Sequence, residues 1–288
     1  MGIDVSVIIV NYNTADLIEG CIQSVLKQKN INMEIIVVDN FSQDNSLDVL
    51  KKYHEQVIIL ANKENLGFGK ANNQAFKLSS GKYIFLLNPD AVLTTEDILE
   101  KFVSYMAENN AVGIVGPKVI KDQKISLPQK LYPAEKYLKK PLEILPGNIA
   151  WIIGASMFIR REVYEQLKGF DEDYFLYGEE ADFCLRARRA GWVIGYNEEI
   201  IVEHIGGASE RTTTTREYWQ KKQAGVILFY KKSYGISEAK NLTERDIKLA
   251  KRKLFWLKFI KNAEKQERYQ TVVEVSSHTL AAAGVWEE

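Results

Sequence analysis

Asn88 and Asp90 stand immediately after a hydrophobic run that has the composition of a buried strand. The run Tyr83–Leu87 stops at Asn88-Pro89-Asp90, within the sequence FLLNPDA. Pro89 fixes its own φ angle and biases Asn88 away from the helical conformation, so the two polar side chains would be held in a set relation. Their oxygens suit Mg²⁺ or Mn²⁺, which bind through one or two carboxylates and complete their coordination with substrate phosphates. The alternative is a strand-to-turn cap, in which Asp90 only accepts hydrogen bonds from backbone N–H groups.

The other predicted strands in the first third of the chain also end in polar residues. In chain order, the runs Val5–Val10, Glu34–Asp39 and Val57–Leu60 are closed or followed by these residues: Asn11 and Asn13, Asp39, and Asn65. Turns favour Asn and Asp, which would explain any one of them. Ligands of open parallel sheets bind at the carboxyl ends of the strands, so polar residues at four such ends indicate a binding site. Carboxylates and amides can pair with the base and the ribose of a nucleotide.

The segment GFGKAN supplies two further candidate contacts, Gly67 and Asn72. A glycine lets the backbone approach a ligand closely, and a helix predicted over Gly67–Leu78 would offer its first N–H groups to an anion. The segment is only superficially similar to a dinucleotide fingerprint, because it follows the third strand and Asn72 replaces the last glycine. The sequence therefore argues against an NAD site and favours another kind of nucleotide.

Three acids lie within four residues at the start of a helix predicted over Glu179–Ala190. Glu179 and Glu180 precede Asp182. A carboxylate in such a position can act as a general base toward a substrate hydroxyl group. Repulsion between the acids raises a pKa, whereas the helix N-terminus lowers it. The alternative is that the two glutamates only favour the helix dipole, and Asp182 is expected to brace the helix through Arg186.

His204 is one of three histidines and follows the apolar stretch IIVE. A histidine in such a place is commonly a structural residue with satisfied hydrogen bonds. Here it precedes Gly206-Gly207, which allow the backbone to come close to a bound group. We therefore keep His204 as a candidate metal ligand together with Asp90.

These side chains must be positioned by alternating strands and helices. In the first third, short apolar strands alternate with helical patterns, which is typical of βαβ units and a parallel sheet. The middle is less regular: a strand over Val112–Val115, a proline-containing loop over Lys118–Asn148, and strands over Trp151–Ile159 and Val193–Tyr196. After about Tyr218 the pattern becomes helical and basic.

The bulk composition excludes several classes of protein. The 288 residues carry 38 Lys and Arg against 38 Asp and Glu, so the chain as a whole is not a nucleic-acid-binding polycation. The first apolar run has no basic segment before it, which indicates a strand rather than a signal peptide, and no apolar stretch reaches the ~18–20 residues that span a bilayer. Two distant cysteines, Cys21 and Cys184, fit a reduced, cytoplasmic protein.

The basic, aromatic segment 247–260, IKLAKRKLFWLKFI, predicts an amphipathic helix. Such a helix can lie on an anionic membrane, which would place the protein peripherally on the inner face of the plasma membrane. It can equally pack on the rest of the chain or on a second subunit, as in a homodimer.

Taken together in order, these motifs resemble those of inverting glycosyltransferases of family 2 with the GT-A fold. The resemblance is strongest to the bacterial rhamnosyltransferase-like branch, which builds cell-surface polysaccharides, and it covers Val5 to Ser209. The motifs that carry it are VSVIIVNYN, VVDN-x-S-x-D-x-S, NLGFGKANN, LLNPDA, GASMFIRRE, GFDEDYFLYGEEADFCLRARRAGW and a histidine before GGAS.

The resemblance implies an α/β fold: a GT-A, Rossmann-like, mostly parallel sheet flanked by helices, with a C-terminal helical extension. Residues 1–217 would form the catalytic domain, with a nucleotide-binding half at about 1–117 and an acceptor-binding half at about 118–217. Residues 218–288 would form the extension.

The resemblance also implies roles for individual residues. Asn11, Asp39 and Asn65 would contact the nucleoside of a nucleotide-sugar. Asn88 and Asp90 would stand at the Asp-x-Asp-type motif that binds the diphosphate and a Mg²⁺ or Mn²⁺ ion, with His204 nearby.

The general base would be Glu180, with Glu179 as the alternative, because the motif reads Glu-Glu where the family commonly has Glu-Asp. The first position of the metal motif is Asn88 rather than an acid, which removes one anionic ligand and leaves metal dependence open.

The resemblance implies an enzyme that moves a sugar from a nucleotide-sugar to a glycan or lipid-linked acceptor. The leading donor is dTDP-L-rhamnose, and UDP-sugars remain open. The first alternative is a sugar nucleotidyltransferase, although NYNTAD lacks the glycine-rich loop with Arg and Lys that such enzymes carry after the first strand. The second is a non-catalytic protein that binds nucleotide-sugars.

Overall fold

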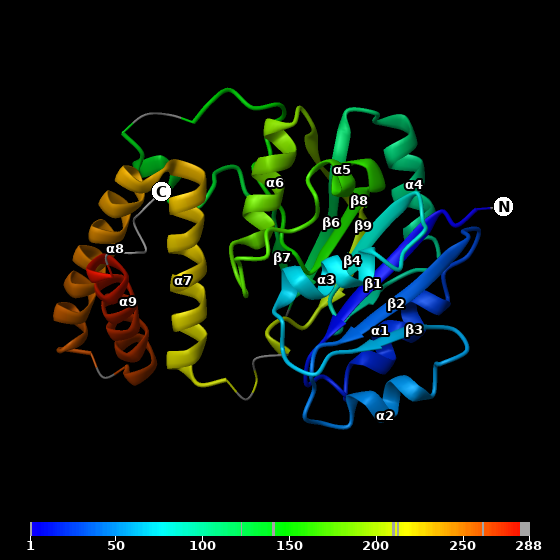
Figure 1. Ribbon diagram of the computed structural model, residues 1–288, viewed down its shortest axis with the longest axis horizontal. Coiled ribbons are helices and arrows are strands. Elements are labelled where there is room, and N and C mark those ends of the chain that lie inside the picture. Colours follow the sequence, from blue (N-terminus) through cyan, green and yellow to red (C-terminus); the bar gives the residue numbers. More distant parts are fainter. Residues whose placement is uncertain are drawn as a thin grey trace.

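A computed structural model describes residues 2–121, 123–139, 142–208, 211, 213–260 and 262–282. Residue 1, Ser209 and residues 283–288, at which the predicted domains or the family resemblance begin or end, lie outside the described residues. Figure 1 shows a central sheet with helices on both faces and the C-terminal helices gathered to one side of it.

The first four strands form a parallel sheet, as predicted. They are β1 (Val5–Asn11), β2 (Met33–Asp39), β3 (Ile58–Ala61) and β4 (Tyr83–Leu87). Their spatial order is β3-β2-β1-β4, and β1 pairs in parallel with both β2 and β4. The β-branched runs of β1 and β2 are buried on both faces, as is usual for parallel strands covered by helices. The strand order reverses between β1 and β4, and ligands of such sheets bind beyond the carboxyl ends of the strands at the reversal.

The remaining strands make the sheet mixed. They are β5 (Ala91–Leu93), β6 (Val112–Lys121), β7 (Lys124–Ser126), β8 (Ser156–Arg160) and β9 (Val193–His204). Strand β8 pairs antiparallel with β4 and β6, β6 pairs in parallel with β9, and β5 and β7 pair antiparallel with β9 and β6. The α/β class is confirmed, but the expected predominance of parallel pairs holds only for the first half of the sheet.

In the part of the chain that the structure describes, six helices cover the two faces of the sheet. They are α1 (Ile18–Leu26), α2 (Ser46–Lys51), α3 (Phe68–Phe76), α4 (Ile98–Glu108), α5 (Arg161–Gln166) and α6 (Glu179–Arg189). One hydrophobic core packs α1 and α4 against the sheet face that includes Val7, and the other packs α3, α5 and α6 against the face that includes Ile8. Neighbouring residues of β1 therefore serve different cores, because successive side chains of a strand point to opposite faces.

The local sequence patterns underestimated the lengths of two strands and overestimated the length of one. Strand β6 continues through Gly116-Pro117, where the register shifts, and β9 runs eight residues past Tyr196 to His204. These two strands pair with each other along most of their lengths, so long-range pairing rather than local composition sets their ends. The stretch predicted as a loop over 118–148 thus begins with a strand and the β6–β7 hairpin. The strand predicted from Trp151 starts only at Ser156.

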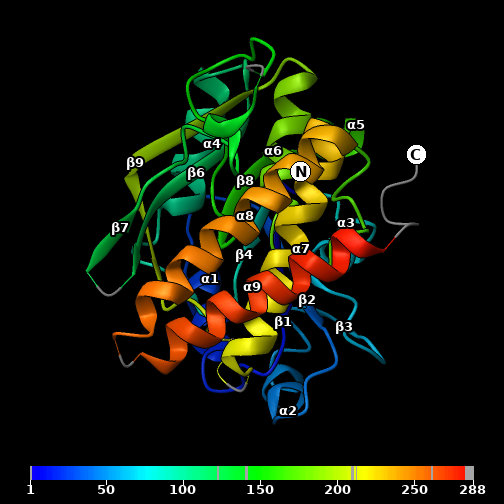
Figure 2. The ribbon, with the colours of Figure 1, turned by 90° about the vertical axis from the view of Figure 1, so that its left-hand side faces the viewer.

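The C-terminal extension is helical, as predicted. It consists of α7 (Thr215–Tyr234), α8 (Ile236–Leu257) and α9 (Ala263–Ala281). Thr214 and Glu217 form a capping box that fixes the start of α7. Helix α7 packs on α6 in a third hydrophobic core, which includes Leu185 and Phe229. Figure 2 shows the three helices together in front of the sheet. Within the described ranges, no helix combines the length and apolarity needed to cross a bilayer.

Candidate active site

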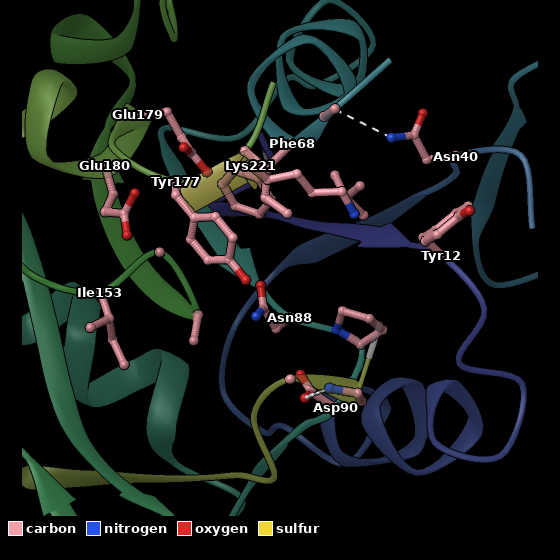
Figure 3. Close-up of a pocket in the computed structure, with 18 of the residues that line it drawn as sticks. Tyr12, Asn40, Phe68, Asn88, Asp90, Ile153, Tyr177, Glu179, Glu180 and Lys221 are labelled. Atoms are coloured by element: carbon pink, nitrogen blue, oxygen red, sulfur yellow. Dashed lines mark hydrogen bonds between the residues drawn. The ribbon is translucent and has the colours of Figure 1, made fainter. Parts of the chain in front are cut away.

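A cavity of about 310 Å³ opens at the carboxyl ends of β1, β2 and β4, where the topology predicts a ligand. Figure 3 shows Tyr12, Asn88 and Asp90 on one side of it, with Glu179, Glu180 and Tyr177 on another. The residues that line it are Val10, Tyr12, Asn40, Asn65, Gly67, Phe68, Asn88, Pro89, Asp90, Ile153, Gly154, Ala155, Phe175, Leu176, Tyr177, Glu179, Glu180, His204, Gly207, Ala208 and Lys221. Most of the candidate residues predicted from the sequence are therefore brought together here: Asn65, Gly67, Asn88, Asp90, Glu179, Glu180 and His204.

Asn11 and Asp39 lie behind the cavity wall and bond to each other. Asn11 Nδ2 donates to Asp39 Oδ1 at 2.8 Å and to Ser42 Oγ at 3.1 Å. The other oxygen of Asp39 accepts from the backbone N–H of Ser42. Both side chains are almost fully buried. In this structure they brace the two strand ends, and their contact with a nucleoside stays a prediction.

Thr14 belongs to the same hydrogen-bond network. Its hydroxyl donates to Asn11 Oδ1 at 2.5 Å, so it does not cap helix α1, which starts after Leu17 without a side-chain cap. Asn13 has a left-handed backbone with φ 53°, and its side-chain oxygen accepts from Gln43 N–H. Asn13 does not line the cavity.

Asn40, Asn65 and Gly67 form the next part of the wall. Asn40 Nδ2 donates to Asn65 Oδ1 at 2.9 Å, and the same oxygen accepts from Gly67 N–H at 3.0 Å. Gly67 has φ +83°, and a Cβ there would lie 2.3 Å from the carbonyl oxygen of Phe175. The close approach that this glycine allows is therefore to Phe175.

The start of helix α3 differs from the predicted anion site in its hydrogen bonds. Phe68 N–H donates to the carbonyl oxygen of Phe175 at 3.0 Å, so this first helical N–H group already has a partner. Asn72 donates to the carbonyl of Phe68, is buried within α3 and does not line the cavity. Its role toward a nucleotide stays a prediction, as does that of Gly67.

Asp90 connects the end of β4 to the end of β9. Its Oδ1 lies 3.1 Å from His204 Nε2, and its Oδ2 accepts from the N–H groups of Gly206 at 2.9 Å and Ala208 at 3.4 Å. Burial raises the pKa of Asp90, but the hydrogen bond and charge of His204, with the two backbone N–H groups, outweigh it and hold this pKa below its ordinary value. Asp90 thus accepts from the backbone of a turn with one oxygen, as the alternative reading of the sequence expects, and faces His204 with the other. Its role toward a metal ion or a diphosphate stays a prediction.

Asn88, Asp90 and His204 offer a small set of donors for a divalent ion. Asn88 Nδ2 lies 3.4 Å from His204 Nε2, so the three side chains converge. Among the described residues, no group of three or more His, Cys, Asp and Glu side chains is arranged to hold a metal. The single carboxylate of Asp90 fits an ion that takes most of its ligands from substrate phosphates and water, as Mg²⁺ commonly does.

Glu179 and Glu180 begin helix α6 on the opposite wall, and their surroundings differ. Glu179 is buried and its Oε2 has no hydrogen-bond partner among the described residues. Burial, followed by the charge of Glu180, raises the pKa of Glu179 well above its ordinary value. Burial also raises the pKa of half-buried Glu180, but the backbone N–H groups at the helix start and the charge of Lys222 oppose the shift. Glu180 is thus the acid of the pair whose ionised form has more support.

A strained turn places these two acids. Tyr177 has φ +70°, which is unfavourable for a side-chain-bearing residue, and Gly178 follows with φ +99°. Gly178 N–H donates to Glu180 Oε2 at 3.3 Å. The turn rests on helix α7, where a Cβ at Gly225 would lie 1.9 Å from the carbonyl oxygen of Tyr177. Only glycine at position 225 lets the helix and the turn come this close.

Several cavity residues were not predicted from the sequence as candidates. Tyr12 and Asn40 each follow a predicted residue directly, so the pattern of polar strand ends could have identified them. Tyr177 directly precedes the Gly-Glu-Glu sequence. Lys221 comes from α7, and no local pattern connects it with strand ends more than 130 positions earlier.

The family model for glycosyl transferase family 2 matches residues 6–168, which is more than half of the chain. The chain belongs to glycosyl transferase family 2. The prediction that it is a glycosyltransferase is therefore confirmed.

Two relatives illustrate the range of the family. The chain is 27% identical, over 70% of its length and 67% of the relative, to the low-salt glycan biosynthesis hexosyltransferase Agl10 of Haloferax volcanii. It is 24% identical, over 70% of its length and 64% of the relative, to the O-antigen chain rhamnosyltransferase WbaN of Salmonella anatum.

Two solved structures share the fold. TarS 1–349 of S. aureus in complex with UDP-GlcNAc aligns with a TM-score of 0.62 at 16% identity, over 94% of this chain and 79% of that one. The mannosyltransferase PcManGT of Pyrobaculum calidifontis, in complex with GDP-Man and Mn²⁺, aligns with a TM-score of 0.58 at 17% identity, over 99% of this chain and 76% of that one. These likenesses confirm the predicted GT-A fold.

Proposed function

We propose that this glycosyltransferase transfers a sugar from a nucleotide-sugar to a hydroxyl group of a glycan or lipid-linked glycan, with inversion at the anomeric carbon. The observation that carries the proposal is the cavity itself. It sets a candidate general base on α6 opposite the candidate diphosphate seat at the end of β4. A single displacement, with the attacking hydroxyl group on the side of the base and the leaving diphosphate on the opposite side, inverts the configuration of the anomeric carbon.

In the proposed reaction the oxygen of the acceptor hydroxyl group attacks the sugar, and Glu180 takes the proton of that hydroxyl group. The raised pKa of Glu180 makes it a stronger base than an exposed glutamate, and the nearby N–H groups and Lys222 keep it available in the ionised form. Glu179, whose pKa is raised further by burial, would stay protonated and act as a neutral neighbour. This division supports Glu180 as the base.

The leaving diphosphate would lie at Asn88 and Asp90. Asp90 Oδ1 and His204 Nε2 would hold Mg²⁺ or Mn²⁺, which when bound would neutralise charge on the diphosphate. The Mn²⁺ of the PcManGT complex is consistent with this, at the level of a shared fold. Asn65 and the bracing pair Asn11 and Asp39 lie toward β1 and β2, where the nucleoside would bind.

The proposed donor is dTDP-L-rhamnose, and the proposed product is a cell-surface polysaccharide. Support comes from the sequence resemblance and from the rhamnosyltransferase among the relatives. The same cavity would also accept UDP-sugars, as the UDP-GlcNAc complex of TarS illustrates for a protein of this fold.

Donor hydrolysis tests the proposal without knowledge of the acceptor. The full chain is incubated with dTDP-L-rhamnose, UDP-GlcNAc and GDP-mannose, with Mn²⁺ or with EDTA, and the released nucleoside diphosphate is quantified. We expect slow release from one donor in preference to the others, and its loss in Glu180→Gln. Release of pyrophosphate from a nucleoside triphosphate and a sugar phosphate would instead identify a nucleotidyltransferase. Tight donor binding without release or transfer would identify a non-catalytic binding protein.

We further propose that the end of α8 contacts an anionic membrane, as the sequence of segment 247–260 predicts. Four large apolar residues are more than half exposed there: Phe255, Trp256, Phe259 and Ile260. The segment contains five Lys or Arg and no Asp or Glu. Exposed aromatic residues among basic ones match the chemistry of an anionic lipid surface. This contact would bring the enzyme to a lipid-linked acceptor at the inner face of the plasma membrane.

Sedimentation with lipid vesicles tests the membrane contact. We expect binding to vesicles that contain phosphatidylglycerol, little binding to phosphatidylcholine alone, and loss of binding in Trp256→Ser/Phe259→Ser. Gel filtration with light scattering tests the other occupant of the same surface, a second copy of the chain. A dimer that the double substitution dissociates, without vesicle binding by the wild type, would overturn the membrane proposal.

A further inference from the structure

Lys221 enters the cavity from a helix that lies outside the nucleotide-binding half of the sheet. It belongs to the second turn of α7, and Figure 3 shows its side chain reaching across the cavity toward Tyr12. It therefore faces the strand-end wall, which includes Asn88, from the opposite side.

The charges around the cavity favour a role for this lysine in binding an anion. Asp90 and Glu180 are the lining acids that the proposed reaction needs in the ionised form, and Lys221 is the one Lys or Arg among the described lining residues. A diphosphate brings about two further negative charges, and Asn88 stands where an additional acid would strengthen a metal site. A diphosphate in this cavity thus needs positive charge, of which the described part of the wall offers Lys221 and, when protonated, His204.

Helix α7 is held firmly enough to present Lys221 in a fixed place. One turn further on, Gly225 packs directly against the carbonyl of Tyr177. Near the end of the helix, Lys232 Nζ contacts Asp171 Oδ2 at 2.5 Å and Asp173 Oδ2 at 2.6 Å. The helix is therefore tied to the segment that leads into Glu179 and Glu180 at two points.

We propose that Lys221 binds the diphosphate of the nucleotide-sugar and stays with it as it leaves. This inference rests on the proposed function and deepens it, because it makes the C-terminal extension part of the donor site. The ammonium group of Lys221 supplies charge-assisted hydrogen bonds to phosphate oxygens, which strengthen as negative charge develops on the leaving group. Its positive charge at the diphosphate compensates for a metal site that has one anionic ligand fewer, because Asn88 stands where an acid would be.

Calorimetric titration with nucleoside diphosphates tests this role. UDP, dTDP and GDP are titrated into the full chain and compared with the corresponding nucleosides, in Mn²⁺ and in EDTA. We expect Lys221→Met to weaken binding of the preferred diphosphate about ten- to a hundredfold, since a hydrogen bond to a charged group is lost. Nucleoside binding should change less than about twofold, and Lys221→Arg should recover most of the affinity.

Lys265→Met is the matched control, because Lys265 is an exposed lysine on α9, outside segment 247–260, and does not line the cavity. It should leave both affinities unchanged, and circular dichroism should show that all the variants are folded. Equal diphosphate affinity in the wild type and Lys221→Met would overturn the role of Lys221 and leave the proposed function standing. If the wild type binds none of the three diphosphates, the proposed function fails, and the inference fails with it.

Discussion

The two walls of the cavity are built in different ways. On the strand-end wall Asn40 donates to Asn65, and directly behind it Asn11 donates to Asp39. On the helical wall, Glu179 keeps a carboxyl oxygen without a described partner, and Tyr177 adopts a left-handed backbone. Satisfied polar networks make a rigid seat, whereas unsatisfied acids and strained backbone are features of sites that do chemistry. The strand-end wall is thus suited to holding a ligand, and the helical wall to acting on it.

Glu180→Gln should have the largest effect, and it tests whether chemistry belongs to the helical wall. We expect kcat to fall by about 10²–10⁴, because general base catalysis typically contributes that much. The affinity for the nucleoside diphosphate should be almost unchanged, since the strand-end wall is untouched. Initial rates of donor consumption at saturating donor check this.

Glu179→Gln is the companion variant, because the amide of glutamine is similar in size and charge to a protonated glutamic acid. It should retain most of the activity. The division of roles between the two acids would be contradicted if Glu179→Gln lost the activity and Glu180→Gln kept it, and the base assignment as a whole if both kept it.

Gly225→Ala should disturb the helical wall without touching any acid. The new methyl group would lie 1.9 Å from the carbonyl oxygen of Tyr177, so the turn that leads into Glu179 and Glu180 must move. We expect kcat to fall at least tenfold and the free energy of unfolding to fall by about 1–3 kcal/mol, as for other overpacked sites. Urea unfolding and initial rates measure the two effects.

Gly20→Ala is the control for this substitution, since a Cβ at that helical position meets nothing within 4 Å. It should leave the rate unchanged and stabilise helix α1 by about 0.5–1 kcal/mol. Wild-type rates in Gly225→Ala would show that the turn tolerates displacement.

Asn11→Ala tests whether the strand-end wall is a scaffold. The substitution leaves buried Asp39 without the side-chain donor it has now, so the free energy of unfolding should fall by about 1–3 kcal/mol. Thermal and urea unfolding measure this. Asn32→Ala is a control on an exposed amide. A loss of donor affinity in Asn11→Ala with unchanged stability would instead favour direct contact with the nucleoside.

Lys222→Met should have the smallest effect and bears on the electrostatics of the helical wall. The charge of Lys222 lowers the pKa of Glu180, so its removal should raise that pKa further. The base must be ionised to act, and activity therefore rises with pH through this pKa. The acidic limb of the kcat profile should therefore move to higher pH. A shift to lower pH would contradict the assigned sign.

The sequence by itself determined the parallel half of the sheet and most of the strand-end wall. The strands β1, β2 and β4 are short, continuous apolar runs, and each ends in polar residues that lie next to it in the chain. The pair of acids at the start of α6 was also visible, because acids and helix start lie within a few residues of each other. Patterns of this kind involve only residues that are close together in the chain, so they can be recognised in the sequence alone.

Only the tertiary structure decided how the second half of the protein completes the site. The ends of β6 and β9 depend on their pairing with each other, and that pairing carries His204 to Asp90 across 114 positions of the chain. Thr14 could have capped a helix, but the buried amide of Asn11 engaged its hydroxyl group instead. The third core packs α7 against α6, which places Gly225 on the turn at Tyr177 and Lys221 in the cavity. Contacts between segments so far apart arise from packing, which no short window of the sequence records.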